Sequence, residues 1–211
     1  MPRKKLHAGK EYRGYSVNQN KERKGLHVPI LDKIIDQTEA MLSHHHQALA
    51  IRFDLRYPEG FTPTLDDNEY ASGFFKKLKK RLSKKKWRVE KSVTRIAYGW
   101  VREVSKDKGN HFHCFLILNA QHIDRCLVRD PLYAELNSAW CSAIGDPAQV
   151  LEGKHLVDLT DNGTRKTHFK RNDRKSINDF VYHCSYMAKS RTKPKDEPMI
   201  FNGSRIKPRT E

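Results

Sequence analysis

The sequence predicts an α+β fold in which helices pack on one face of a central antiparallel β-sheet. Three observations support this fold class. Apolar residues alternate with polar ones at residues 49–57, which is typical of a half-buried strand. Two further strand-like runs, residues 94–104 and 111–119, flank a short polar turn and therefore predict a β-hairpin. Helical patterns surround these strands, and such a mixture indicates an α+β sheet.

The remaining elements follow from the spacing of apolar residues. Those that recur at helical spacing predict helices at residues 29–43, 69–87, 132–144 and 176–190. Short apolar runs predict two further strands, at residues 156–159 and 167–170.

The two ends of the chain are basic and poor in apolar residues. Residues 1–27 show no periodicity, so we expect a flexible N-terminal arm. Residues 191–211 are basic and interrupted by proline and glycine, so we expect a C-terminal tail. This division leaves residues 28–190 as one folded domain, a usual size for a single core.

The charge of the chain favours a polyanionic partner. Its 211 residues include 41 Lys+Arg against 25 Asp+Glu, which gives a formal net charge of +16, and the basic residues occur in blocks. Such a balance is typical of proteins that bind nucleic acid. The chain has no apolar run that could span a bilayer and no apolar leader, so we expect an intracellular protein without a membrane partner.

The strand at residues 111–119 carries the most informative side chains. His111 and His113 share one face because side chains alternate along a strand. Glu103, in the preceding strand, can face either histidine in an antiparallel hairpin. Two imidazoles and a carboxylate suit a divalent ion such as Mg²⁺, Mn²⁺ or Zn²⁺ and leave positions for substrate oxygens. The sequence therefore predicts a metal site of Glu103, His111 and His113.

The final predicted helix places two phenols and an ammonium on one side. Tyr182, Tyr186 and Lys189 are spaced by four and three residues, which are neighbouring positions on a helix. A cation close to a phenol favours the phenolate and can stabilise charge on a phosphate under attack. The plain structural alternative is an aromatic core stripe with a lysine that reaches solvent.

The helix at residues 69–87 has a lysine-rich face with few acidic partners. A phosphate backbone would relieve the repulsion among these lysines, although a solvated helix face is the simpler alternative. Together with arginines on the strands, the predicted DNA-contacting residues are Arg52, Arg56, Lys76, Lys80, Lys84 and Arg102.

In the order of these motifs the chain resembles the HUH endonucleases, the rolling-circle replication initiators, which carry a His-hydrophobic-His pair before a Tyr-x-x-Lys helix. More narrowly, it resembles the inovirus Gp2-type replication proteins of filamentous phages and bacterial prophages. The resemblance covers about residues 28–205 and implies an HUH/Rep nuclease-like, RRM-like core. Four motifs carry it: Arg52-Phe53-Asp54-Leu55, Trp100-Val101-Arg102-Glu103, His111-Phe112-His113 and Ser185-Tyr186-Met187-Ala188-Lys189.

The resemblance implies a metal-dependent, site-specific endonuclease and strand transferase that acts on single-stranded origin DNA. Tyr186 would be the nucleophile that forms a 5′-phosphotyrosine link, and Lys189 would assist at the phosphate. Tyr182 stands where initiators with two tyrosines carry the second nucleophile, but it could equally be a packing residue. The metal would be Mg²⁺ or Mn²⁺. The implied partners are origin DNA and the helicase and polymerase of a bacterial host, in whose cytoplasm the protein would act.

Asp54 lies on the strand that matches the first family motif, between two arginines. It is expected to be an ion-paired support or a group that positions DNA, and not a metal ligand. Three other interpretations of the whole chain stay open. The first is a non-catalytic DNA-binding protein, such as a repressor or a degenerate initiator, and the second is an RNA-binding module.

The third interpretation is a structural zinc site formed by the two histidines with Cys114 or Cys184. Cys114 points away from both histidines if the strand is regular. The cysteines lack Cys-x-x-Cys spacing, so they are expected to be reduced and mostly buried thiols. They are Cys114, Cys126, Cys141 and Cys184.

Overall fold

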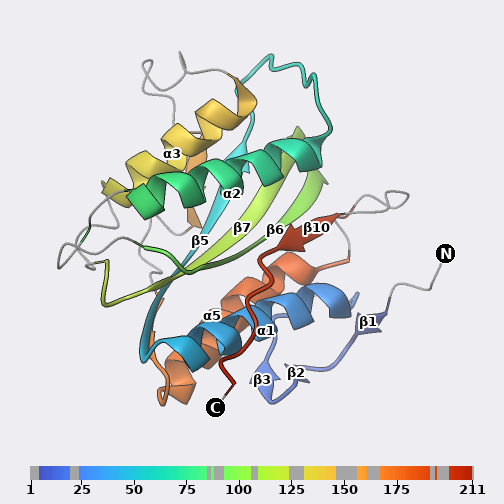
Figure 1. Ribbon diagram of the computed structural model, residues 1–211. Coiled ribbons are helices and arrows are strands. Elements are labelled where there is room, and N and C mark those ends of the chain that lie inside the picture. Colours follow the sequence, from blue (N-terminus) through green and yellow to red (C-terminus); the bar gives the residue numbers. More distant parts are fainter. Residues whose placement is uncertain are drawn as a thin grey trace.

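A six-stranded antiparallel sheet forms the centre of the computed structural model (Figure 1). Its strand order is β10-β6-β7-β5-β8, and β9 also pairs with β5. The strands are β5 (Gln47–Arg56), β6 (Ile96–Ser105), β7 (Gly109–Asn119), β8 (Val157–Leu159), β9 (Thr167–Lys170) and β10 (Phe201–Gly203). The structure describes residues 5–19, 24–84, 87, 93–105, 109–123, 131–145, 156–160, 167–190, 193 and 200–210.

Helices cover both faces of this sheet (Figure 1). On one face lie α2 (Asp67–Lys84) and α3 (Pro131–Ile144), and on the other lie α1 (Val28–His44) and α5 (Arg174–Ser185). The α+β class and the central antiparallel sheet are therefore confirmed, but the expectation of helices on one face is wrong. The central strands carry apolar side chains of both parities, so each face needs its own cover.

The face beneath α2 and α3 is largely apolar, apart from the buried ion pair of Arg102 and Asp67. Phe53, Trp100, Phe112 and Trp140 lie in this layer and are almost completely buried. The opposite layer, beneath α1 and α5, uses smaller strand residues such as Ala48 and Ala50 together with Phe115 and Ile117. Gly99 lies opposite Phe115 in the register, and a Cβ at this position would collide with the Phe115 ring.

The N-terminal residues are ordered against α1 and α5, so the predicted flexible arm is wrong for the described part of residues 1–27. β1 (Leu6–His7) pairs with β4 (Leu26–His27), and β2 (Glu11–Tyr12) pairs with β3 (Tyr15–Ser16). Tyr15 is only 3% exposed and belongs to the core. A few well-spaced apolar residues are enough to dock this segment, which has too few of them to show a period.

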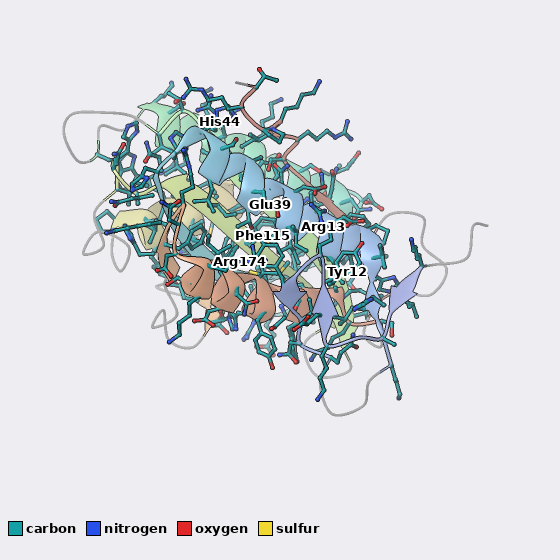
Figure 2. All side chains as sticks on the ribbon, turned by 90° about the horizontal axis from the view of Figure 1, so that it is seen from below. Tyr12, Arg13, Glu39, His44, Phe115 and Arg174 are labelled. Carbon is teal, nitrogen blue, oxygen red and sulfur yellow. The ribbon has the colours of Figure 1, made fainter. Side chains whose placement is uncertain are left out.

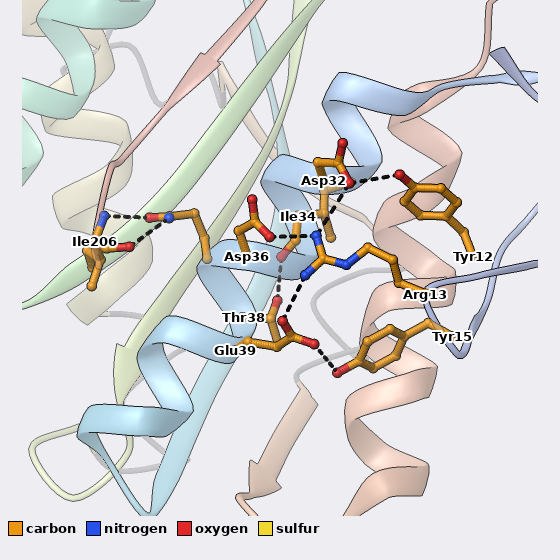
Figure 3. A network of polar contacts seen from close by, with 10 residues as sticks. Tyr12, Arg13, Tyr15, Asp32, Ile34, Asp36, Thr38, Glu39 and Ile206 are labelled. Carbon is orange, nitrogen blue, oxygen red and sulfur yellow. Dashed lines mark hydrogen bonds and ion pairs between the residues drawn. The ribbon is translucent and has the colours of Figure 1, made fainter. Parts of the chain in front are cut away.

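Acidic side chains of α1 hold the β2–β3 turn in place. Arg13 forms ion pairs with Asp32, Asp36 and Glu39 at 3.3, 2.6 and 3.0 Å (Figure 3). The Tyr15 hydroxyl donates to Glu39 as well, at 3.1 Å. Figure 2 shows this turn beside α1 from below the sheet. Arg13, one of the basic residues of the expected arm, thus has its partners within the same chain.

The C-terminal segment is also part of the fold. β10 pairs with β6 at the edge of the central sheet, and the Ser204 hydroxyl donates to Gln37 of α1 at 2.5 Å. Gln37 also accepts from the Ile206 amide at 3.1 Å (Figure 3). The expectation that residues 191–211 form a tail is therefore wrong for Lys193 and residues 200–206, because main-chain pairing replaces the missing apolar content. Within the described ranges, no helix combines the length and apolar content needed to cross a membrane.

Candidate metal and nucleophile site

The β6–β7 hairpin brings the three predicted metal ligands together. Glu103 lies directly opposite His111 in the register, and Val101 lies opposite His113. One ligand atom from each of Glu103, His111 and His113 falls within 4.8 Å of the others, and all three residues are buried. The predicted convergence of these residues is confirmed. Among the described histidine, cysteine, aspartate and glutamate residues, these three are the group whose ligand atoms lie close enough together to hold a metal ion.

Asp54 of β5 supports this group from the neighbouring strand. It lies opposite His113, and its Oδ1 accepts a hydrogen bond from His113 Nδ1 at 2.6 Å. The other ring nitrogen, Nε2, lies 3.2 Å from Glu103 Oε2. Carboxylates commonly hold one nitrogen of a metal-binding histidine and so orient the other toward the ion. Asp54 therefore has the supporting position expected for it, although its partner is His113.

His111 is held in a form suited to ligation. Its Nδ1 donates to the carbonyl oxygen of Gly109 at 3.1 Å, since a carbonyl can only accept. This leaves Nε2 unprotonated in the neutral ring. Burial lowers the pKa of His111 below its ordinary value, which also favours the neutral form.

The groups around His113 are strongly coupled. Burial lowers its pKa, but hydrogen bonds to Asp54 and Glu103 outweigh burial and raise the pKa above the ordinary histidine value. Burial likewise raises the pKa of each carboxyl group, while hydrogen bonding to His113 and nearby positive charge lower it more. The pKa of both Asp54 and Glu103 therefore lies below its ordinary value. The two buried carboxylates thus stay ionised and favour positive charge beside them.

A lysine that the sequence did not mark as a site residue also contacts this cluster. The ammonium of Lys193 donates to Glu103 Oε1, and the Lys193 side chain is only 1% exposed. Burial lowers the pKa of this amine, against the effect of Glu103, which raises it. In the sequence Lys193 is one of several basic residues near the C-terminus, and no spacing distinguishes it from its neighbours.

Tyr186 lies next to the cluster in a short 3₁₀ turn, η4 (Tyr186–Ala188), that follows α5. Its ring is half-buried and meets the His113 ring edge-on, with centroids 6.4 Å apart. The guanidinium of Arg52 lies 5.0 Å from the centroid of the Tyr186 ring, and Lys189 also places its ammonium over that ring. A phenol, two cations and the predicted metal ligands thus occupy one end of the sheet.

Tyr182 has a different environment. The α-helix was expected to continue to residue 190 but ends at Ser185, so Tyr182 and Tyr186 do not share one regular helix. Tyr182 is 45% exposed. No ring contact among the described residues joins it to His111 or His113. Its role as a second nucleophile stays a prediction.

The residues predicted to contact DNA divide into three groups. Arg102 is 4% exposed and forms an ion pair with Asp67 at 2.9 Å in the layer beneath α2, so this prediction is wrong. It fails because neighbouring strand residues face opposite sides and Glu103 takes the site face.

Arg52 is buried over Tyr186, whereas Arg56 is partly exposed and pairs with Asp158 at 2.6 Å. The exposed residues Lys76, Lys80 and Lys84 belong to α2, on the opposite face of the sheet from the histidines.

The cysteines do not join the cluster. Cys114, Cys141 and Cys184 are buried free thiols, as expected, and Cys126 lies outside the described residues. Cys114 belongs to the layer beneath α2 and α3, away from His113. This placement removes the zinc site that would have used Cys114.

Comparisons with known proteins give a family but no activity. A family model described as "YagK/YfjJ C-terminal domain" matches residues 11–204. The chain is also similar to "Uncharacterized protein YfjJ" of Escherichia coli (strain K12), with 30% identity over 190 residues that cover 80% of this chain and 90% of the relative. No solved structure matches the chain. Neither name states an activity, so the resemblance to HUH endonucleases stays a prediction. The match extends over nearly the whole fold, and this chain belongs to the YagK/YfjJ C-terminal domain family.

Proposed function

We propose that this protein is a replication initiator that nicks single-stranded origin DNA with Tyr186 and later rejoins the strands. One observation carries this proposal: a half-buried tyrosine lies edge-on to His113 of a Glu-His-His group able to hold a divalent ion. The net charge of +16 supports a polyanionic substrate. Neither feature alone indicates DNA cleavage, but together they supply a nucleophile, a cation site and an attraction for phosphate.

The ligand group fits Mg²⁺ or Mn²⁺ by its chemistry. Glu103 offers carboxylate oxygens, and His111 offers an unprotonated nitrogen because its other nitrogen donates to Gly109. Asp54 orients His113 through a 2.6 Å hydrogen bond. When bound there, a divalent ion would withdraw charge from the scissile phosphate as a Lewis acid.

The chain's own side chains would perform the bond changes. The Tyr186 oxygen attacks phosphorus and loses its proton, while the bond from phosphorus to the 3′ oxygen breaks and that oxygen takes up a proton. Arg52 and Lys189, which lie over the Tyr186 ring, stabilise the negative charge that develops on the attacking oxygen and the phosphate. The products are a 5′-phosphotyrosine and a free 3′-OH, and attack by a 3′-OH reverses the reaction.

A covalent-adduct assay tests the proposal. Labelled single-stranded oligonucleotides that tile the DNA around the gene are incubated with the protein and Mn²⁺, and adducts are separated under denaturing conditions. We expect an adduct that is lost without a divalent ion and lost in Tyr186→Phe. The matched control is Tyr182→Phe, which removes an exposed phenol and should retain the adduct. An adduct in Tyr186→Phe would show that the nucleophile is another residue.

The second candidate is a DNA-binding protein without cleavage activity, such as a repressor or a degenerate initiator. The exposed lysines of α2 favour it, because a DNA contact there needs nothing from the histidine cluster on the opposite face. This candidate predicts salt-dependent DNA binding that is unchanged by Mn²⁺ and yields no adduct. Lys76→Gln with Lys80→Gln should then weaken binding more than His113→Ala does.

A further inference from the structure

The Lys193 ammonium occupies a position that a bound ion would need. Its side chain is almost completely buried, and Nζ donates to Oε1 of Glu103. The second oxygen of Glu103 faces His113 Nε2 at 3.2 Å. Both oxygens of the carboxylate are therefore engaged by positively charged or proton-bearing groups. A buried ammonium is costly without an anionic partner, so Glu103 is what keeps Lys193 inside the protein.

The charges of the site change when a divalent ion replaces these contacts. Glu103 and Asp54 supply two negative charges, and histidine ligands bind metals in the neutral form. A divalent ion alone balances both carboxylates, so the ammonium of Lys193 becomes surplus positive charge in a buried site. It must leave Glu103 or find another anion. A phosphodiester carries one negative charge and is the substrate class proposed for this site.

We propose that the ammonium of Lys193 occupies the cation position at Glu103 until a divalent ion binds. Lys193 then exchanges its ion pair with Glu103 for one with a phosphate of the DNA. The inference rests on the proposed function and deepens it. Lys193 is a positioning residue in this scheme, because it acts through Glu103 and sets how tightly the ion binds. The same C-terminal stretch carries Tyr186, Lys189 and Lys193, so the released ammonium lies on the segment that presents the nucleophile.

The scheme couples metal and DNA. Without DNA, an incoming ion must displace Lys193 and therefore binds weakly. With DNA, the ammonium gains a phosphate partner and the cost of displacement falls. Since such coupling is reciprocal, DNA should tighten Mn²⁺ binding by the same factor by which Mn²⁺ tightens DNA binding.

Titration calorimetry with Mn²⁺ alone, on the full chain and without DNA, tests the competition. Lys193→Met keeps an unbranched side chain but removes the charge, and we expect it to bind Mn²⁺ at least about tenfold more tightly than the original protein, which corresponds to about 1.4 kcal/mol. The matched control is Lys193→Arg, which retains a cation and should leave the affinity close to the original. Equal or weaker binding by folded Lys193→Met would overturn the inference, as would no binding by either protein.

Amine labelling of the unaltered protein gives a second test that does not depend on a variant's folding. An acylating reagent is applied with and without saturating Mn²⁺, and modified lysines are quantified by mass spectrometry. We expect Lys193 to be protected without Mn²⁺ and several-fold more reactive with it, whereas exposed Lys76 of α2 should be unchanged. Continued protection of Lys193 would overturn the inference.

These two readouts contain no DNA, so they are independent of strand cleavage. Adduct formation with unchanged Lys193 reactivity would reject the role of Lys193 and leave the proposed function standing. Release of Lys193 by Mn²⁺ without adduct formation would do the reverse.

Discussion

The two faces of the central sheet use the same strands in different ways. Beneath α2 and α3, apolar side chains cover most of the strands, as Leu49, Phe53 and Phe112 illustrate, and a buried ion pair joins Arg102 to Asp67. Beneath α1 and α5, the face is apolar in one half and ionic in the other, where Asp54 and His113 lie. Buried ionisable groups contribute less stability than apolar packing and cluster at functional sites. The comparison indicates that the first face stabilises the fold, whereas the ionic half of the second is the part proposed to act on DNA.

The largest expected effect comes from a cavity on the apolar face. Phe53→Ala should lower the free energy of unfolding by about 3–5 kcal/mol, because Phe53 is fully buried and its neighbours cannot fill the space. Urea denaturation measures the change. The control is Val104→Ala, a large exposed apolar residue of the hairpin, which should change stability by less than about 0.5 kcal/mol. Similar losses in both variants would contradict the burial of Phe53 in the apolar layer.

The ionic half should respond differently to single and paired changes. Glu103→Gln leaves the buried Lys193 ammonium without its anion and should cost about 3 kcal/mol of unfolding free energy. The double variant Glu103→Gln with Lys193→Met removes both charges and should recover most of that loss. The same urea assay forms a double-mutant cycle for the pair. If the losses simply add, Lys193 and Glu103 are not paired in solution.

Asp54 should affect metal affinity more than stability. Asp54→Asn weakens the hydrogen bond that orients His113, so we expect Mn²⁺ to bind about 10–100-fold more weakly. Asp158→Asn is the matched control, since Asp158 lies next to Asp54 in the register but pairs with exposed Arg56. Calorimetry measures both affinities. Unchanged affinity in Asp54→Asn would show that His113 is not a ligand.

The smallest expected effect is a pH dependence at the far end of the sheet. Burial and the positive charges of Arg95, His44, His122 and Arg171 lower the pKa of His45 to about 4, so this histidine is neutral in the folded protein. The unfolded chain takes up a proton near pH 6.5, and stability is therefore lost as the pH falls from about 6.5 to about 4.

The pKa of His111 is lowered too, so its contribution to stability is also lost below about pH 6.5, and thermal unfolding of His45→Gln at pH 7, 5 and 4 separates the effect of His45 from it. His45→Gln should reduce the loss of Tm between pH 7 and 5. Asp54 and Glu103 have lowered pKa values, so they favour folding above the pKa of the unfolded chain, which is near 4, and their contribution is lost only below that pH. An unchanged profile in His45→Gln would place the acid sensitivity in another group.

Local patterns predicted most of the elements and the centre of the site. The strand at residues 167–170 has the predicted bounds, and the hairpin places Glu103 opposite His111, which is one of the two histidines that it was expected to face. These predictions succeed because alternation and turn residues act over a few positions. The charged side chains of β5 were expected on a polar face, yet Arg52 is covered by Tyr186. Apolar patterning does not reveal a layer formed by rings and cations.

The missed features depend on ion pairs between distant parts of the chain. Arg13 pairs with acidic residues of α1, and Lys193 pairs with Glu103, although each looks like an ordinary basic residue in its own segment. Nothing in the adjacent sequence distinguishes a solvated arginine or lysine from one with a distant partner. The same limit explains why both chain ends were expected to lie outside the folded domain.

The pairing of β10 with β6 also has a consequence during translation. β6 presents an unpaired edge until residues 201–203 have left the ribosome, and open strand edges are sites of association between nascent chains. Gln37 of α1 likewise gains its hydrogen bond from Ser204 only when that residue has been made. Synthesis of β10 therefore closes this side of the sheet, and a product released before it would expose an unpaired strand edge beside an intact pair of histidines.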